Sequence, residues 1–269
     1  MEFHETKLIE GFHPYRLDKE LAEGSMSVIY EGTHLNTGQS VIIKVPSMIT
    51  RWTGMEPDII ENVEDLRFEA QFLRRSNLIG ISGVVTLLSD RTDDLIPFIA
   101  LAKLGDSLAD MIEADQQFDL KESLALLRDV AHTIEALHSH GMFHYDIKPG
   151  NILWSDTSWK LIDPCSQEKN TEEYYENRYS RGTDRDVLAL GRTFISMYVG
   201  HEGEVHFPTG YGYEVEDYPE LLNLLNRMVG HSRYSVTSAT DVRRKAGRIL
   251  RMLEQWGQPD RADMLLALF

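Results

Sequence analysis

The sequence predicts an α+β protein in which a strand-rich segment with one long helix is followed by a mostly helical segment. Short apolar runs separated by turn residues dominate up to residue 104, a pattern typical of antiparallel strands. After a linker at residues 103–106, apolar residues recur at helical spacing instead. We expect an N-terminal extension over residues 1–11, a first lobe over residues 12–104 and a second lobe over residues 105–269.

Strand signals are clearest in residues 14–45. Residues 27–32 are rich in β-branched and aromatic side chains, residues 36–38 (Asn-Thr-Gly) form a turn signal, and residues 41–45 are a short apolar run. These features predict a hairpin-rich sheet. Strand character returns within residues 84–104, first at 84–88 and then at 97–101.

Helical spacing marks two long segments. In residues 58–75 the apolar side chains fall near one face and the charges on the other. In the second segment Gly141 ends an apolar pattern spaced by three, three, one, three and three: Leu124, Leu127, Val130, Ala131, Ile134 and Leu137. Two short strands are then expected at 151–154 and 159–162, followed by helices near 184–199, 217–228, 237–255 and 258–268.

Composition and charge exclude several classes of protein. The chain has 269 residues and a formal net charge of −16, whereas a nucleic-acid-binding protein usually carries a basic excess. No run approaches the roughly 18 apolar residues of a membrane span, and the N-terminus lacks a signal-peptide pattern. The single cysteine, Cys165, allows no intrachain disulfide, which fits a reducing compartment. We expect a cytoplasmic protein without nucleic-acid or membrane partners.

The residue types that phosphoryl transfer requires lie in residues 144–151, read as HYDIKPGN. This reaction needs a carboxylate that orients the attacking hydroxyl, cations that neutralise developing charge, and oxygen ligands for Mg²⁺. Asp146 can be the carboxylate, Lys148 the cation and Asn151 a metal ligand. Asp163, at the end of the following strand pair, can hold Mg²⁺ together with Asn151.

A second group of candidates lies in the strand-rich segment. Lys44 ends an apolar strand, and Glu69 on the following helix can hold it by an ion pair. The turn at residues 22–27 precedes a strand and can fold over phosphates with its backbone N–H groups.

Together these residues resemble the protein kinase family. Its signature is a Gly-rich loop, a strand lysine, a helix glutamate, an H-R-D-x-x-x-x-N loop and a D-F-G triplet. The chain has LAEGSMSVIYEG, VIIKV, RFEAQFL, HYDIKPGN and LIDPC in this order. Residues 186–191 (DVLALG) resemble the family's helix beneath the catalytic loop, and Arg233 resembles an arginine near the end of the C-lobe. The resemblance covers about residues 12–255, and Lys148 resembles the Ser/Thr-specific members of the family.

The resemblance implies a bilobal protein-kinase-like fold, with an N-lobe of antiparallel sheet plus one helix and a mostly helical C-lobe. It implies phosphoryl transfer from ATP, with Mg²⁺, to a Ser or Thr hydroxyl of a protein substrate. Asp146 and Lys148 would be catalytic, and Asn151 and Asp163 would hold the metal. The nucleotide would be bound by Ala22, Gly24, Ser27, Ile29, Ile42, Lys44, Glu69, Leu101, Lys103 and Leu153. Asp186 is expected to accept backbone hydrogen bonds from the catalytic loop, and His144 is expected to be a structural core residue.

The chain departs from the family pattern in the Gly-rich loop and beyond it. Ala22 and Ser27 stand at two glycine positions, and Ile42 replaces a small alanine, which predicts a tighter purine pocket.

Pro164 replaces the D-F-G phenylalanine and fixes φ, which predicts a stiffer segment. The A-P-E triplet is missing, and Glu173 or Glu176 would have to pair with Arg233 in its place. The arginine of H-R-D is Tyr145, which predicts an enzyme that no activating phosphate within residues 165–183 switches on.

Two other functions stay open. A small-molecule kinase of the aminoglycoside or choline kinase type shares the fold, and residues 149–153 (PGNIL) look much like such enzymes. A pseudokinase scaffold is the second alternative, because the glycine loop and the DPC triplet are altered. The complete set of Lys44, Glu69, Asp146, Asn151 and Asp163 argues against it.

Overall fold

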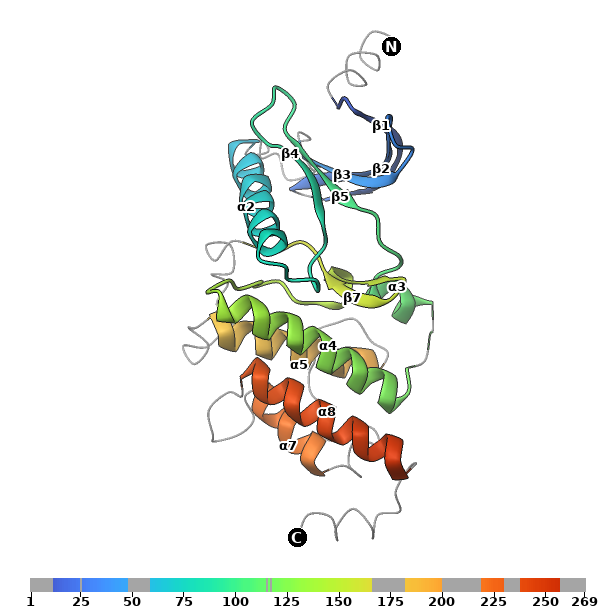
Figure 1. Cartoon of the computed structure of the whole chain (residues 1–269), viewed down its shortest axis with the longest axis vertical. Helices are drawn as coiled ribbons and strands as arrows, with labels where there is room; N and C mark the ends of the chain where they lie inside the picture. Colours follow the sequence, from blue (N-terminus) through green and yellow to red (C-terminus); the bar gives the residue numbers. More distant parts are fainter. Residues whose placement is uncertain are drawn as a thin grey trace, which may run out of the picture. The chain divides into compact units, whose positions relative to one another are not determined.

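The computed structural model describes residues 12–24, 26–47, 59–114, 116, 118–165, 182–199, 219–229 and 238–256. The described residues form two compact units (Figure 1). Unit 1 contains the described residues up to Gly80 and the segment Val84–Leu104. Unit 2 contains Ile81–Gly83 and the described residues from Gly105 onward. The extension at 1–11, the helix predicted at 258–268, Glu173, Glu176 and Arg233 lie outside the described residues.

Unit 1 contains a five-stranded antiparallel sheet with the strand order β1-β2-β3-β5-β4. Its strands are β1 (Tyr15–Glu23), β2 (Ser27–His34), β3 (Ser40–Pro46), β4 (Leu87–Arg91) and β5 (Phe98–Ala102). The predicted turn at residues 36–38 is confirmed between β2 and β3, where Gly38 has φ 72°. Glycine adopts this left-handed conformation without the steric penalty of a side chain.

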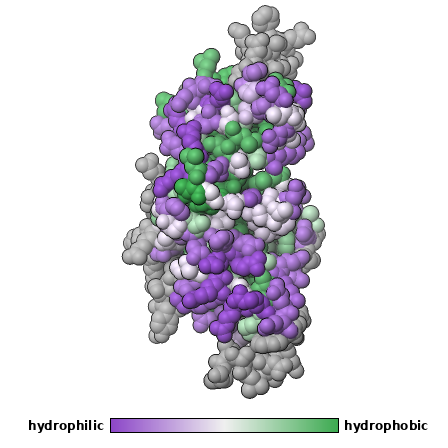
Figure 2. All heavy atoms as spheres, viewed as in Figure 1, coloured by the Kyte–Doolittle hydropathy of each residue, from purple (hydrophilic) through white to green (hydrophobic). Residues whose placement is uncertain are grey.

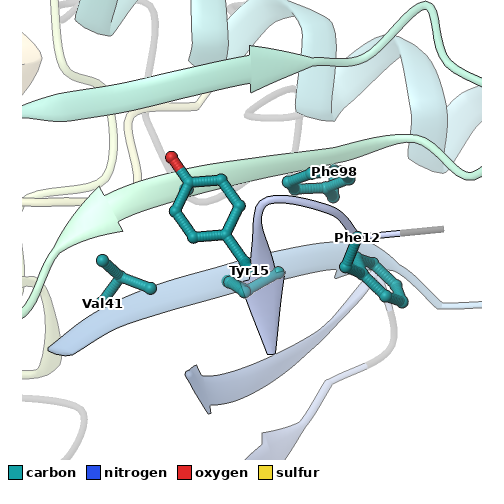
Figure 3. Packing of buried hydrophobic residues seen from close by; sticks show 6 residues of the cluster. Phe12, Tyr15, Val41 and Phe98 are labelled. Atoms are coloured by element: carbon teal, nitrogen blue, oxygen red, sulfur yellow. The ribbon is translucent and has the colours of Figure 1, made fainter. Parts of the chain in front are cut away.

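One face of this sheet carries an apolar core (Figure 3), where Tyr15 and the rings of Phe12 and Phe98 gather with Val41. The centroids of Phe12 and Phe98 are 5.1 Å apart. Ile43 belongs to the same cluster. Because side chains alternate across a strand, the burial of residues 41 and 43 places residues 42 and 44 of β3 on the opposite face.

The sheet of unit 1 also contacts a long helix, α2 (Ile59–Leu78). Leu66, Ala70 and Leu73 are buried on it, at the spacing of one helical face. The strand predicted at 84–88 instead begins at Leu87. The reason is Asn77, whose side chain donates to the Val85 carbonyl and accepts from the Leu87 backbone N–H, so these backbone groups are satisfied by a side chain.

The longest helix of unit 2, α4 (Leu120–Ser139), confirms its predicted pattern. All six predicted apolar positions are buried. Asp119 and Glu122 form a capping box at its start, which satisfies two N-terminal N–H groups. The helix ends just before Gly141, which has φ 65°. A short helix, α3 (Leu108–Glu113), precedes it.

After α4 come the 3-10 turn η1 (Pro149–Asn151) and a hairpin of β6 (Ile152–Ser155) and β7 (Ser158–Leu161). The first and last residues of both strands each lie one position from the predicted bounds. The described residues after this hairpin include three helices: α5 (Gly182–Val199), α7 (Pro219–Met228) and α8 (Ala239–Trp256). In Figure 1, α4 lies beside α5 and α8. Within the described ranges, no helix has the length and apolar character needed to cross a bilayer.

Hydrophilic side chains cover the visible face of α8 (Figure 2). This helix carries a run of basic residues between positions 243 and 251, of which Arg243 pairs with Glu135 at 2.5 Å and Arg248 with Glu220 at 3.5 Å. The run is therefore a solvated, ion-paired face.

Candidate active site

The loop that carries Asp146 is anchored to α5 through a buried carboxylate. Asp186 accepts the backbone N–H of His144 at 2.9 Å and that of Tyr145 at 2.8 Å. Its Oδ2 atom also lies 2.9 Å from Nε2 of His138. Asp186 is completely buried, where hydrogen bonds to a carboxylate are strong. The structural role expected of Asp186 is confirmed; His138, 48 residues away in sequence, was not foreseen as its partner.

Tyr145 has a left-handed backbone, with φ 63°. This conformation is rare for bulky residues and costs on the order of 1–3 kcal/mol. The hydrogen bond from its N–H to Asp186 helps to hold the strained turn. The residue directly before Asp146 is therefore fixed by tertiary contacts and not by local preference.

The Asp146 carboxylate is oriented by two donors on one oxygen. Lys148 Nζ and Asn151 Nδ2 each lie 2.9 Å from Oδ2. Asn151 Nδ2 also donates to the Asp146 carbonyl at 2.9 Å. Because both side-chain bonds fall on Oδ2, the carboxylate has a fixed orientation in which Oδ1 can accept a proton from a hydroxyl.

Lys148 stays protonated in this setting. Burial lowers the pKa of its ammonium group, but the hydrogen bond to Asp146 and the nearby charges of Asp146 and Asp163 outweigh burial and raise the pKa above its usual value. A cation therefore remains next to the carboxylate over the physiological pH range.

Asn151 and Asp163 lie at the same end of the β6–β7 hairpin. The register pairs Ile152 with Leu161, and the Ile162 N–H donates to the Asn151 carbonyl at 3.1 Å. Asp163 follows directly, with φ 58°. Asp163 offers a carboxylate, and Asn151 offers its Oδ1 atom because its bonds to Asp146 use Nδ2. These two oxygen donors fit a hard cation such as Mg²⁺, which also keeps other oxygen ligands. No group of three or more His, Cys, Asp or Glu residues suited to a metal occurs in the part of the chain that the structure describes.

The ring of His144 is buried, and the backbone of this residue contacts the DPC segment. Burial lowers the pKa of the fully buried His144 ring, although Asp186, Asp146 and Asp163 oppose the effect. The ring is therefore neutral, in line with the predicted core role. The Cys165 N–H donates to the His144 carbonyl at 3.0 Å, so the segment after Asp163 is tied to the loop that carries Asp146.

In unit 1 the predicted ion pair is confirmed. Lys44 Nζ lies 2.7 Å from Glu69 Oε2, and their side chains are only 11% and 5% exposed. The strand β3 directs Lys44 away from the apolar core, and the buried face of α2 supplies Glu69. Glu64 and Asp65 lie on the same helix, but they are not buried, whereas Glu69 is.

The predicted phosphate turn joins β1 to β2. Ala22 pairs with Ile29, and Ser27 opens β2. The Gly24 N–H donates to the Ser27 carbonyl at 2.7 Å, and a Cβ at Gly24 would lie 3.2 Å from that oxygen. A glycine therefore suits this tight turn.

The other predicted nucleotide residues occupy regular strand positions. Ile29 pairs with Lys44 and Ile42 with Leu101 in the sheet of unit 1. Leu153 lies on β6 of unit 2, opposite Lys160. Their contacts with a nucleotide stay predictions.

Lys103 has a partner that was not foreseen. Its Nζ lies 2.6 Å from Glu31 Oε1, and this hydrogen bond lowers the pKa of the Glu31 carboxyl. The alternation of β2 places Ser27, Ile29 and Glu31 on one face, but this spacing does not identify Lys103 as the partner of Glu31.

Comparison with known proteins agrees with this arrangement. The sequence matches the protein kinase domain family over residues 15–182, which is more than half of the chain. The chain belongs to this family. The predicted fold class is thereby confirmed, with an antiparallel sheet and helix in unit 1 and a helical unit 2.

Several curated relatives are similar at low identity. A probable serine/threonine-protein kinase PknB of Corynebacterium glutamicum is 25% identical over 231 residues, which cover 76% of this chain and 34% of that protein. Calcium-dependent protein kinase 6 of Oryza sativa subsp. japonica is 30% identical over 60% of this chain and 28% of its own length. A probable myosin light chain kinase of Dictyostelium discoideum is 30% identical over 55% of this chain and 35% of its own length. The chain thus spans about a third of the length of these relatives.

Proposed function

We propose that this protein transfers the γ-phosphoryl group of ATP to a Ser or Thr hydroxyl of a protein substrate. The observation that carries the proposal is the Asp146 carboxylate, held through Oδ2 by Lys148 and Asn151 at 2.9 Å each. We further propose that residues 12–104 and 105–269 act as the two lobes of one kinase domain.

Asp146 acts as the general base. Its Oδ1 atom accepts the proton of the attacking hydroxyl, a contribution worth roughly 10²–10⁴-fold in rate. Lys148, protonated because its pKa is raised, stabilises the charge on the transferring phosphoryl group.

Lys44 binds the α- and β-phosphates of ATP, and Glu69 fixes its ammonium group for this task. Ala22, Gly24 and Ser27 hold the phosphates through the β1–β2 turn, while Ile29, Ile42, Leu101, Lys103 and Leu153 contact the rest of the nucleotide. These assignments are supported by the matching family positions.

Asn151 Oδ1 and the Asp163 carboxylate would hold Mg²⁺. When bound, the ion neutralises negative charge on the phosphate oxygens. The chain's own contribution is to fix both ligands on one hairpin end through the Ile162–Asn151 backbone bond.

A protein acceptor is favoured over a small molecule by Lys148 and by the relatives, which are named as protein kinases. The test is incubation of the full chain with γ-labelled ATP and Mg²⁺, with a generic protein substrate in one arm and a panel of small alcohols and amino alcohols in the other. Label on Ser or Thr of the protein supports the proposal. Label on an alcohol alone assigns a small-molecule kinase, and label in neither arm supports a pseudokinase.

A further inference from the structure

The side chain of Tyr145 approaches two residues at the beginning of α5, Arg185 and Gly182. The guanidinium carbon of Arg185 lies 5.9 Å from the centre of the tyrosine ring, within the range of a cation–π contact. The ring of Phe143 packs on the same tyrosine with centroids 5.8 Å apart. The aromatic ring thus contacts one apolar and one cationic neighbour.

Gly182, the first residue of α5, makes this approach possible. A Cβ at Gly182 would lie 2.5 Å from Cγ of Phe143 and 2.6 Å from the hydroxyl oxygen of Tyr145. Any side chain there would force the two aromatic rings to move. The hydroxyl therefore reaches the helix backbone only because residue 182 is a glycine.

The main chain of Tyr145 contacts the same helix turn. Its N–H donates to Asp186 at 2.8 Å, one residue beyond Arg185. The side chain and backbone of Tyr145 thus contact three of the first five residues of α5: Gly182, Arg185 and Asp186. The left-handed φ of 63° is what allows both groups to face the helix at once.

We infer that Tyr145 is a positioning residue: it clamps the strained turn before Asp146 onto α5 and so fixes the direction of the Asp146 carboxylate. The inference rests on the proposed function of Asp146, which the clamp would serve. The contacts of the ring with Phe143 and Arg185 provide this fixation in the unmodified chain. No added charge is needed to complete it.

The phenol is neutral in this position. Burial raises the pKa of the Tyr145 hydroxyl, the charge of Asp186 adds to the effect, and Arg185 opposes it. A neutral, partly buried ring gives the clamp the same form at every physiological pH.

The test compares Tyr145→Leu, Tyr145→Phe and Arg185→Met in the full chain, with Arg251→Met as the matched loss of an exposed arginine on α8. Two quantities are measured: kcat and KM for ATP, and amide hydrogen exchange at residues 144–146. Tyr145→Leu is expected to lower kcat about 10- to 100-fold with KM for ATP unchanged, because misplacement of a catalytic group costs rate and not nucleotide binding. Tyr145→Phe keeps the ring that contacts Phe143 and Arg185, so it is expected to lose less than about tenfold in kcat.

Amide exchange separates the inference from the proposed function. Faster exchange at residues 144–146 in Tyr145→Leu and Arg185→Met, but not in Arg251→Met, supports the clamp even if the wild type transfers no phosphate. Unchanged exchange together with unchanged kcat in Tyr145→Leu overturns the clamp. If Tyr145→Leu does not fold, the same two measurements on Arg185→Met and Tyr145→Phe decide whether Tyr145 is a positioning residue. Activity that is equal in the wild type and in Asp146→Asn would contradict the proposed function alone.

Discussion

The two charged centres of the protein are stabilised in different ways. In unit 1, Lys44 and Glu69 form a short, buried ion pair between a strand and a helix. The Asp146 loop in unit 2 is held by a network that includes the Asp186 carboxylate, two backbone N–H groups and the side chains of Lys148 and Asn151. A buried ion pair can often be replaced by an apolar pair at little cost in stability, whereas a hydrogen-bond network is weakened when a shared member is lost.

The largest expected effect follows from Asp186→Ala. Removal of the carboxylate leaves buried N–H groups of His144 and Tyr145 without their acceptor, so the free energy of unfolding should fall by about 3–5 kcal/mol. Phosphoryl transfer should be lost as well. Urea unfolding of Asp186→Ala beside Asp156→Ala, an exposed aspartate in the β6–β7 turn, measures the difference; equal unfolding free energies would mean that the network does not hold the loop.

The ion pair in unit 1 offers the contrasting result. Glu69→Leu alone removes the carboxylate that lies 2.7 Å from the buried Lys44 ammonium and should cost about 3 kcal/mol of unfolding free energy. The double variant Lys44→Met/Glu69→Leu should recover most of this stability, since an apolar pair of similar size often replaces a buried ion pair at little cost. Both variants should be inactive. Equal stability of the single and double variants in urea titrations would show that the pair is not the unit of stability.

A pH effect distinguishes the two centres further. Because burial lowers the pKa of folded His144 below the ordinary 6.5, the unfolded chain takes up this proton first as pH falls. The free energy of unfolding should therefore decrease below pH 6.5, by at most about 1.4 kcal/mol per pH unit for one group.

Urea unfolding at several pH values between 5 and 7.5 measures this slope. His144→Leu should reduce the slope, whereas substitution of the exposed His132 by Gln should leave it as in the wild type. A slope that is the same in His144→Leu and the wild type would assign the acid sensitivity to other groups.

The smallest effect is expected at the solvent-exposed pair of Lys103 and Glu31. Their side chains are 41% and 30% exposed, and ion pairs between solvent-exposed side chains contribute little to stability. Glu31→Gln should therefore shift the melting temperature by only a few degrees. A loss of stability as large as that of Glu69→Leu would contradict the distinction between buried and exposed pairs.

Local patterns predicted much of the fold and part of the site. The apolar spacing of α4 was sufficient because a helix is specified by residues three and four apart. The start of β4 was missed because the Asn77 side chain, ten residues earlier, bonds to Leu87.

In the site, Lys44 and Glu69 were recognised together because both belong to short motifs. The partnership of His138 with Asp186 and that of Lys103 with Glu31 join residues 48 and 72 positions apart. No local spacing encodes such pairs, since they arise only when packing brings distant elements together.

The central claim is that Asp146 serves as the base of a protein phosphotransferase. Its most direct test is the transfer of γ-labelled phosphate to a Ser/Thr protein substrate by the wild type, Asp146→Asn and the matched control Asp156→Asn, which changes an exposed aspartate. We predict that Asp146→Asn loses at least about 10²-fold in kcat, the lower value for general base catalysis, while Asp156→Asn retains wild-type activity. Equal incorporation of label by all three proteins would contradict the claim.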